Sequence, residues 1–505
     1  MAGIGFTLKK LFREESYSSR TKAYLYSALV AAGPWIASVI TINTIIFITE
    51  IFVPIPREKQ LLMGTMVYSF VFSQIFTAPW QILITRYISD KLYSQEYDFI
   101  RPSFIGLNKI LASSAFIMGI IFYFNKDIPF IYKTMSVYLF IIITMIWILM
   151  VYMSAVKNYQ LIAWAYILGG VLSIALTLYF SGNPIPFSSL QYASNLLFAY
   201  LAGLSVTFLV LAYNFLSTFY FGNRLEFDFL RYFSKVPSLF LVGLFYTLGL
   251  WIDDIIMWFS IAGVRVYDTY LYAPIYDNAV FLAYLTVIPS MVMFLVSVET
   301  SFYDEYKTYY GMVNKSGTFE EIEFARKEMG RSLYRELLRT FQVQALISVT
   351  LVMLSGPIFD FFNISIIIRD IFKVCTMGAL FNIFILLIVL VLLYFEVRIK
   401  AILITFLFFA SNLLLTVYYA GKGLKFYGYG FTISSLITVM IAMVISARLF
   451  KKLNFATFAL QPVFEEREKG LFVLIADYLN RYQGKPADEK SRLPLQQNTG
   501  HGIDI

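Results

Sequence analysis

Cysteine and histidine are almost absent from this 505-residue sequence, which contains one of each. Disulfide frameworks and cysteine-based metal sites need several cysteines, so the lone Cys375 excludes both. The only histidine, His501, lies in a polar tail, so histidine catalysis and a histidine metal site are almost excluded. A G-x-x-x-x-G-K-[ST] phosphate-binding loop is also missing, which argues against direct drive by ATP. We therefore expect no cofactor and no bound metal.

Charged residues are scarce as well. They make up only 14% of the chain, compared with roughly 25% in soluble domains. Hydrophobic residues make up 59%, which is more apolar surface than a soluble core of this length can bury. The net charge of +8 does not indicate nucleic acid as a partner, because the basic residues cluster between hydrophobic segments, as topology signals do. The composition therefore predicts a polytopic protein of the lipid bilayer.

Long apolar segments account for most of the chain. A transmembrane helix needs about 20 mostly apolar residues, and twelve segments meet this requirement. We expect them at 23–50, 61–85, 104–124, 134–156, 159–180, 191–221, 236–260, 276–298, 341–362, 371–396, 399–420 and 427–448. The predicted fold class is therefore an all-α polytopic membrane protein. Gly356-Pro357 interrupts the ninth segment.

The orientation follows from the distribution of lysine and arginine. Most of the 40 basic residues lie in the N-terminal segment, the even-numbered loops and the C-terminal tail. Because cytoplasmic loops carry the excess of these residues, both termini are predicted in the cytoplasm. An even number of spans, which puts both termini on the same side, agrees with this. We expect a multi-pass protein of the cytoplasmic (inner) membrane.

The polar stretch between the sixth and seventh segments divides the chain into two halves. We expect an N-terminal six-helix lobe at 1–222, beginning with an interfacial helix, and a linker at 223–235. A C-terminal six-helix lobe follows at 236–451. The tail at 452–505 is predicted to be cytoplasmic and partly disordered, because its end is polar and rich in proline, glutamine and glycine.

A cytoplasmic amphipathic helix is predicted in the loop at about 299–340. Thr318 and Glu321 have the spacing of a capping box, in which each side chain satisfies a backbone N–H of the first turn. An apolar stripe at helical spacing follows, formed by Ile322, Ala325, Met329 and Leu333. The stripe predicts a helix that lies on the membrane surface or on a partner.

Prolines interrupt several of the predicted spans. Gly33 and Pro34 fall within the first span, where the missing N–H and the clash with the preceding turn predict a kink or break. Pro79 and Pro289 fall within the second and eighth spans, which are the second helices of the two halves. Interrupted helices in matching positions indicate the central site of a transporter, although proline is also common in ordinary membrane helices.

Two adjacent carboxylates, Asp253 and Asp254, lie in the apolar segment LGLWIDDIIMWF. Counting about 1.5 Å per residue from the cytoplasmic end of the seventh span places them in the outer half of the membrane. A charge there is costly, which makes the pair a candidate for the transport path, together with Tyr246 and Asn43. Adjacent helical residues diverge by about 100°, so we expect one aspartate to face a central cavity and the other a neighbouring helix. The alternative is that both lie in the outer headgroup region.

Charged residues at the cytoplasmic ends of the second and eighth spans are candidates for an inner gate. Arg86, Asp90 and Glu299 are placed so that they can pair between the two halves. Charges at the ends of membrane helices are also common without any such role. The sequence alone leaves both interpretations open.

Several stretches in order along the chain resemble the PelG family of exopolysaccharide transporters. They are MAGIGFTLKKLF at the start, SALVAAGPWIAS, TRYISDKLY, YTLGLWIDDIIMWF, and FLAYLTVIPSMVMFLVSVETSFYDEYKTYY. The resemblance implies the multidrug/oligosaccharidyl-lipid/polysaccharide (MOP) exporter fold, with twelve helices in two lobes around a central cavity. It also implies a biofilm role, moving the Pel amino-sugar polymer across the inner membrane. The implied partners are that polymer, a cytoplasmic glycosyltransferase and inner-membrane Pel proteins that include a cyclic di-GMP sensor.

Other functions remain open at this point. The same fold would serve a lipid-linked oligosaccharide flippase or a cation-coupled drug exporter, because a fold does not determine a cargo. A scaffold that assembles a polysaccharide synthase without transporting anything is a further alternative. An enzyme is not expected. A partly deacetylated Pel polymer would be cationic and attracted by the aspartates, whereas a neutral polymer would leave them to bind a coupling ion.

Overall fold

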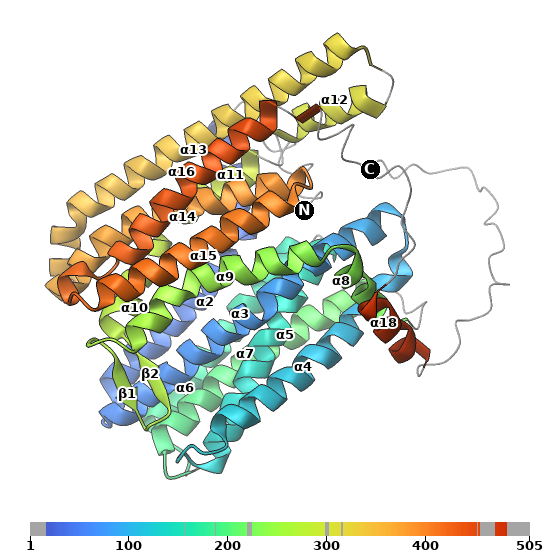
Figure 1. Cartoon of the computed structure of the whole chain (residues 1–505). Helices are drawn as coiled ribbons and strands as arrows, with labels where there is room; N and C mark the ends of the chain where they lie inside the picture. The colour runs from blue at the N-terminus through green and yellow to red at the C-terminus, as the bar shows by residue number, and fades with distance from the viewer. Residues whose placement is uncertain are drawn as a thin grey trace.

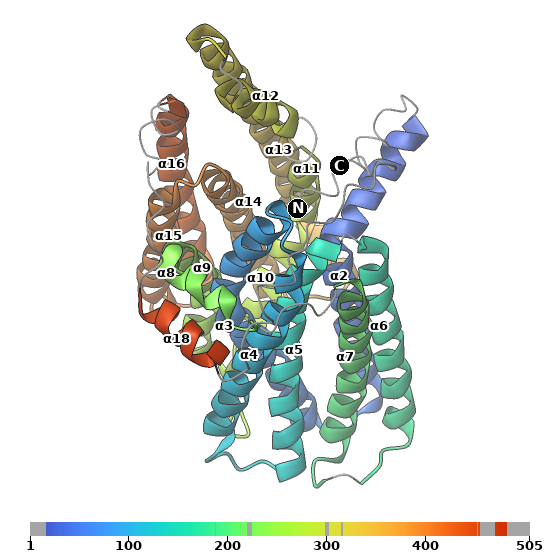
Figure 2. The same ribbon diagram turned by 90° about the vertical axis from the view of Figure 1, so that its right-hand side faces the viewer.

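The computed structural model describes residues 17–156, 158–186, 188–219, 225–297, 302–314, 317–451, 453–454 and 470–481. In this part of the chain, twelve helices are long and apolar enough to cross a membrane, which confirms the predicted number of spans. Figures 1 and 2 show them packed lengthwise into one bundle. The α-helices are α2 (Tyr17–Phe52), α3 (Pro56–Tyr93), α4 (Ile100–Tyr123), α5 (Phe130–Val156), α6 (Tyr159–Gly182), α7 (Gln191–Thr218), α8 (Arg231–Lys235), α9 (Pro237–Trp258), α10 (Pro274–Leu285), α11 (Ile288–Ser297), α12 (Tyr303–Asn314), α13 (Phe319–Phe361), α14 (Ile366–Tyr394), α15 (Arg398–Ala420), α16 (Tyr429–Lys451) and α18 (Leu471–Arg481).

Short elements complete the fold. They are the 3₁₀ turns η1 (Tyr97–Phe99), η2 (Asp228–Leu230) and η4 (Leu424–Phe426), and the antiparallel strands β1 (Val264–Val266) and β2 (Tyr270–Tyr272). The strands form a hairpin at one end of the bundle, and α8, α12 and α18 lie at the opposite end (Figure 1). We call these the hairpin end and the α8 end. The predicted N-terminal interfacial helix and most of the predicted tail lie outside the described residues.

Proline at the first helical position starts several of these helices. Pro56, Pro237 and Pro274 begin α3, α9 and α10. A proline there loses nothing, because the first N–H of a helix has no intrahelical partner and its fixed φ already suits the helix. The start of α10 matters for the site, since it places the first turn of that helix directly after the β-hairpin.

Contacts between helices form two sets. The helices α2 to α7 pack on one another, as do α9, α10 and α13 to α16. The two sets meet where α3 packs on α9 and where α2 packs on α11. At the first of these crossings, a Cβ atom on Gly243 would lie 2.6 Å from the Ala78 carbonyl oxygen, so glycine is what allows α9 to approach α3. The predicted lobe boundaries themselves stay a prediction.

The amphipathic helix and the ninth span, predicted as separate elements, form one continuous helix of 43 residues, α13. Its capping box is present as predicted, with Thr318 and Glu321 satisfying each other's backbone N–H groups. Pro357 does not end the helix, which continues for about one more turn to Phe361. The apolar stripe is buried within the protein, and not on the membrane surface as one interpretation held.

The predicted helix breaks are partly wrong. Pro34 lies within the continuous helix α2, and Pro79 lies within the continuous helix α3. Only Pro289 marks a break, because α10 ends at Leu285 and α11 begins at Ile288. The two halves therefore do not share an interrupted second helix.

Candidate functional site

Three buried carboxylates lie close together toward the hairpin end. Asp253 and Asp254 are on α9, with exposed fractions of 1% and 3%, and Asp277 is in the first turn of α10. Their depth relative to the membrane stays a prediction. Their burial corrects the expectation that one aspartate faces a cavity, since both point into packed protein.

Asp253 is fully hydrogen-bonded. One oxygen accepts from the Tyr276 hydroxyl at 2.7 Å, and the other from the Asn412 amide at 3.0 Å. Asn412 is itself held in place, because its amide also donates to the Gly249 carbonyl at 2.9 Å and its own oxygen accepts from Thr416. Asp253 therefore links α9 to α10 and α15, and each of its two oxygens already accepts a hydrogen bond.

Asp254 has a different environment. Its side chain is in hydrogen-bonding contact with Asp277, while its Oδ2 atom is buried without a partner. Asp277 also accepts from the Trp258 indole at 3.2 Å and from the Ala273 backbone N–H at 3.1 Å. Two carboxylates are both acceptors, so they can bond to each other only by sharing a proton. The Asp254–Asp277 pair is therefore a candidate proton-binding site.

A metal ion is not the better explanation of this pair. Within the described ranges, no group of three or more histidine, cysteine, aspartate or glutamate side chains is arranged to hold one. Asp253 points its oxygens at donors from α10 and α15, and these already satisfy it. Only two carboxylates then converge, which is few ligands for a hard cation.

Further polar groups surround the three aspartates. The Tyr284 hydroxyl on α10 is buried without a hydrogen-bond partner, and so is the Asn382 amide nitrogen on α14. Tyr246 donates to the Asn382 oxygen at 3.3 Å. It lies seven residues before Asp253, which places both on one face of α9. Tyr246 therefore lies about 10 Å along α9 from Asp253, and its place on the transport path stays a prediction.

Asn43, the fourth path candidate, is not part of this cluster. It is exposed on α2, and its amide donates to the carbonyl of Val39 in its own helix. The sequence reasoning instead missed Asp277, Asn382 and Asn412. The two asparagines stand alone in apolar segments, which was a usable signal, whereas Asp277 looks like an ordinary acidic residue of a first helical turn.

The break between α10 and α11 is stabilised by a side chain from α13. Gln344, fully buried, donates to the free carbonyl of Thr286 at 3.1 Å and accepts from the Ser290 hydroxyl at 2.5 Å. Backbone groups inside a membrane need such partners, because no water is there to satisfy them. The break between α10 and α11 is therefore stabilised by side-chain hydrogen bonds within the membrane segment. It lies about 18 Å along the helix from Pro274.

Ion pairs connect the two sets of helices at the α8 end. Arg86 on α3 pairs with Glu396 at 2.6 Å, in the loop between α14 and α15. The same guanidinium pairs with Asp90 at 3.0 Å, and Glu396 also pairs with Arg398 at 3.0 Å. Arg86 therefore pairs with Asp90 in its own helix and with Glu396 from the other set of helices, and the role of Arg86 and Asp90 as an inner gate stays a prediction. Glu299 lies outside the described residues.

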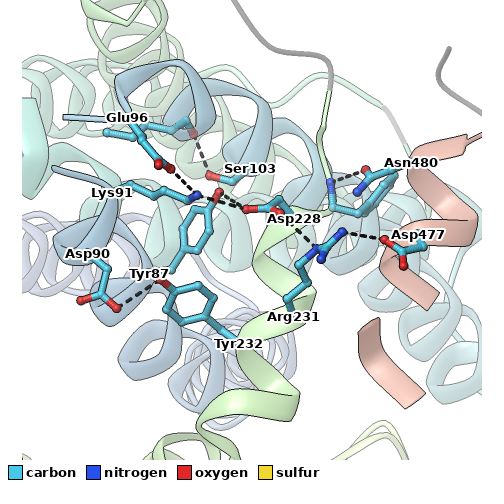
Figure 3. Close-up of polar contacts among 12 residues, drawn as sticks. Tyr87, Asp90, Lys91, Glu96, Ser103, Asp228, Arg231, Tyr232, Asp477 and Asn480 are labelled. Atoms are coloured by element: carbon cyan, nitrogen blue, oxygen red, sulfur yellow. Dashed lines mark hydrogen bonds and ion pairs between the residues drawn. The ribbon is translucent and has the colours of Figure 1, made fainter. Parts of the chain in front are cut away.

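A second polar network lies beside the first and is drawn in Figure 3. Asp228 of η2 receives Lys91 of α3 at 3.4 Å and Arg231 of α8 at 3.3 Å. Arg231 reaches onward to Asp477 of α18 at 2.6 Å, and Asn480 of α18 accepts from the backbone of the same connecting segment. The segment between the two sets of helices is therefore fastened to α3 on one side and to α18 on the other.

The fold is that of membrane transporters of the MOP superfamily. A mutant of the Vibrio cholerae MATE transporter VcmN is 13% identical, with a TM-score of 0.62, and the match covers 90% of this chain and 99% of that one. A MOP superfamily transporter from Pyrococcus furiosus is 13% identical, with a TM-score of 0.57 and coverage of 86% and 96%. A multidrug resistance MATE transporter in an outward-facing conformation gives a TM-score of 0.58 at 13% identity, with coverage of 85% and 96%.

The comparison with protein families is more specific than the comparison of folds. The model of the PelG family, the exopolysaccharide exporter (EPS-E) family, matches residues 1–458. The chain therefore belongs to the PelG family, as the ordered sequence stretches predicted. A comparison with curated proteins finds no match.

Proposed function

We propose that this protein moves the Pel exopolysaccharide, an amino-sugar polymer of the biofilm matrix, across the cytoplasmic membrane. The observation that supports this most strongly is the family match over residues 1–458, combined with the transporter fold. The proposal places the α8 end in the cytoplasm. Basic side chains gather at that end, and cytoplasmic loops carry such an excess; examples are Arg86, Lys91, Arg231, Lys235 and Arg398.

In this proposal, the Asp254–Asp277 pair couples proton binding to movement of the helices. With the shared proton, the two carboxyls hold the start of α10 against α9. Loss of the proton leaves two like charges in a medium of low dielectric constant without a counter-ion, and their repulsion separates the two helices. Direct attraction of a cationic polymer fits less well, because both side chains are buried.

The movement would be passed on through the broken helix. A displacement of α10 reaches the joint held by Gln344, and α11, beyond the joint, packs on α2 of the other set of helices. At the α8 end, the Arg86–Glu396 pair holds the two sets together. We propose that this pair is the inner gate, and that it opens when the sets separate.

The proposed partners lie at the cytoplasmic end. The glycosyltransferase that makes the polymer would deliver it at the α8 end, with inner-membrane Pel proteins, including a cyclic di-GMP sensor, in the same assembly. A second candidate function, a cation-coupled exporter of small molecules, is favoured by the same buried carboxyl pair, since proton coupling does not specify the cargo.

Secretion in cells tests the proposal. A strain lacking this transporter would be complemented with the wild type, Asp254→Asn or Asp277→Asn, and polymer outside and inside the cells would be measured together with membrane levels of each protein. Asp268→Asn is the matched control, because that carboxylate is exposed on the hairpin at the same end. We expect both cluster variants to stop secretion and the control to secrete normally. Normal secretion without this protein would refute polymer export, and normal secretion by both cluster variants would refute the proton role.

A further inference from the structure

Trp258, the last residue of α9, contacts both the carboxyl pair and the other set of helices. Its indole N–H donates to Asp277 at 3.2 Å. Its ring lies against the ring of Tyr68 of α3, with the centroids 4.9 Å apart and the planes inclined by 16°. Trp258 is only 2% exposed, so both contacts belong to the packed interior. Trp258 therefore connects the Asp254–Asp277 pair to α3.

The β-hairpin contacts the same tyrosine. The Tyr68 hydroxyl accepts from the Leu271 backbone N–H at 3.0 Å. The ring of Tyr270, the preceding residue of β2, meets the Tyr68 ring edge-on, with the centroids 5.0 Å apart. Because β2 leads directly into α10, the first turn of α10 is connected to Tyr68 by two routes. One is the Trp258 indole, and the other is the backbone of β2.

Tyr270 fastens the hairpin to the helices α3 and α4. It is fully buried, and its hydroxyl accepts from Thr65 of α3 at 3.1 Å. The same hydroxyl is hydrogen-bonded to the Tyr123 hydroxyl of α4 at 2.5 Å. A Cβ atom on Gly64 would lie 3.0 Å from the Tyr270 side chain, so the ring is packed closely on α3. Buried contacts therefore hold the two sets of helices together at the hairpin end. At the α8 end, by contrast, the ion pair between the sets joins exposed side chains.

The titratable side chains that face the carboxyl pair from the surrounding elements are an acid, phenols and a thiol. They are Tyr68 of α3, Asp253 of α9, Tyr272 of β2, Tyr276 and Tyr284 of α10, and Cys375 of α14. None of these six is cationic, so none can neutralise the second negative charge that appears when the shared proton leaves. The two carboxylates then repel each other, and the start of α10 moves away from α9. The indole is rigid, so its N–H cannot follow Asp277 while its ring stays against Tyr68.

We propose that Trp258 is the positioning residue through which the Asp254–Asp277 pair controls the contact between the two sets of helices at the hairpin end. The inference rests on the proposed function, in which this pair couples proton binding to movement, and it adds how the movement reaches the outward end. With the shared proton in place, the indole and β2 hold Tyr68, and the hairpin end stays closed. Without the proton, the displaced α10 withdraws both from Tyr68, and the hairpin end opens. A polymer longer than the bilayer is thick occupies both ends at once, so its passage needs this opening together with that of the inner gate.

Distance measurements between two spin labels test this in the full chain. The labels would be attached to Asn183→Cys, at the end of α6, and to Asp268→Cys, on the hairpin, which are exposed positions on the two sets. The native Cys375 is fully buried and stays unlabelled. In nanodiscs, the population at the longer distance should rise at least about 5-fold between about pH 5 and about pH 9. Asp254→Asn has no shared proton to lose, so it should stay at the shorter distance throughout.

Variants of the indole and of its partner test the role of Trp258. Trp258→Phe keeps an aromatic ring against Tyr68 but removes the N–H donor to Asp277, so the rise with pH should fall below about 2-fold. Tyr68→Leu removes the ring from the other side of the contact and should reduce the rise in the same way. Trp251→Phe is the matched control, because that indole, also on α9, donates to Gln74 of α3 at 2.9 Å and not to a carboxylate. It should keep the wild-type response.

Secretion measured alongside separates a failure of this proposal from a failure of the proposed function. A rise in Trp258→Phe and Tyr68→Leu as large as in the wild type would overturn the role of Trp258, and so would a wild-type distance that does not change with pH. An equal loss of response in Trp251→Phe would also overturn it, because any contact between α3 and α9 would then suffice. If Asp254→Asn stops secretion in any of these cases, the proton role of the pair stands and only the role of Trp258 fails. If Asp254→Asn and Asp277→Asn both secrete normally, the proton role fails, and this inference fails with it.

Discussion

Substitutions at two adjacent aspartates should have opposite effects on stability. Asp253→Ala removes the acceptor of two buried donors, Tyr276 and Asn412. A buried polar group left unsatisfied costs about 1–3 kcal/mol, so the variant should lose about 2–6 kcal/mol of stability. Asp254→Asn keeps its one contact, because the new amide can donate to the Asp277 carboxylate, and the Oδ2 atom of Asp254 has no partner to lose. That variant should lose less than about 1 kcal/mol or gain stability.

Thermal unfolding in detergent, monitored by size-exclusion chromatography, gives the order of the unfolding midpoints of the two variants. Because membrane proteins often unfold irreversibly, the midpoints should be compared at one heating rate and not converted into free energies. We expect Asp253→Ala well below the wild type, and Asp254→Asn at or above it, although Asp254→Asn should still fail in secretion. The reverse order of midpoints would refute the division of the cluster into a structural aspartate and a proton-sharing pair.

Three more predictions concern other parts of the fold. Gln344→Ala should lower the unfolding midpoint strongly, since it leaves two buried polar groups at the α10–α11 break unsatisfied, at a cost of about 2–6 kcal/mol; an unchanged midpoint would show that water or a rearrangement satisfies the break. Gly243→Ala should also lower the midpoint, because the new Cβ would clash with the backbone of α3, whereas Gly356→Ala on open helix surface should not; equal midpoints would contradict the close crossing. Arg86→Ala and Glu396→Ala should each impair secretion, with the double variant no worse than either, while stability changes by only about 0.2–1 kcal/mol, as for an exposed pair; additive losses of secretion would argue against a shared gate.

The fold was largely predictable because membrane spans depend on long apolar segments, which a sequence displays directly. All twelve were found, and so was the start of α13 at its capping box. The continuity of α13 was not predictable, because its outer half is polar enough to look like a separate soluble helix. The prolines misled for a related reason: Pro34 and Pro79 are accommodated within continuous helices, and only the chain around Pro289 separates into two, with Gln344 supplying the missing bond.

The candidate site was predictable only in part. Asp253 and Asp254 stood out because charge is rare inside apolar segments. Their division of roles depends on which neighbours α9 meets, and that is a property of tertiary packing. Asp277 escaped notice because an acidic residue in the first turn of a helix has an ordinary electrostatic explanation. Likewise, Arg86 was identified from its position at a helix end, but its partner Glu396 was recognised only once α3 and the α14–α15 loop were seen side by side.

Transport into membrane vesicles tests the central claim most directly. Inverted vesicles containing this protein and the glycosyltransferase would be supplied with the nucleotide sugar, and polymer protected inside the vesicles would be measured. The account predicts that enclosed polymer requires this protein and is lost with Asp254→Asn, while polymer made outside is unchanged. Polymer that enters equally well without this protein, or with Asp254→Asn in its place, would contradict the account.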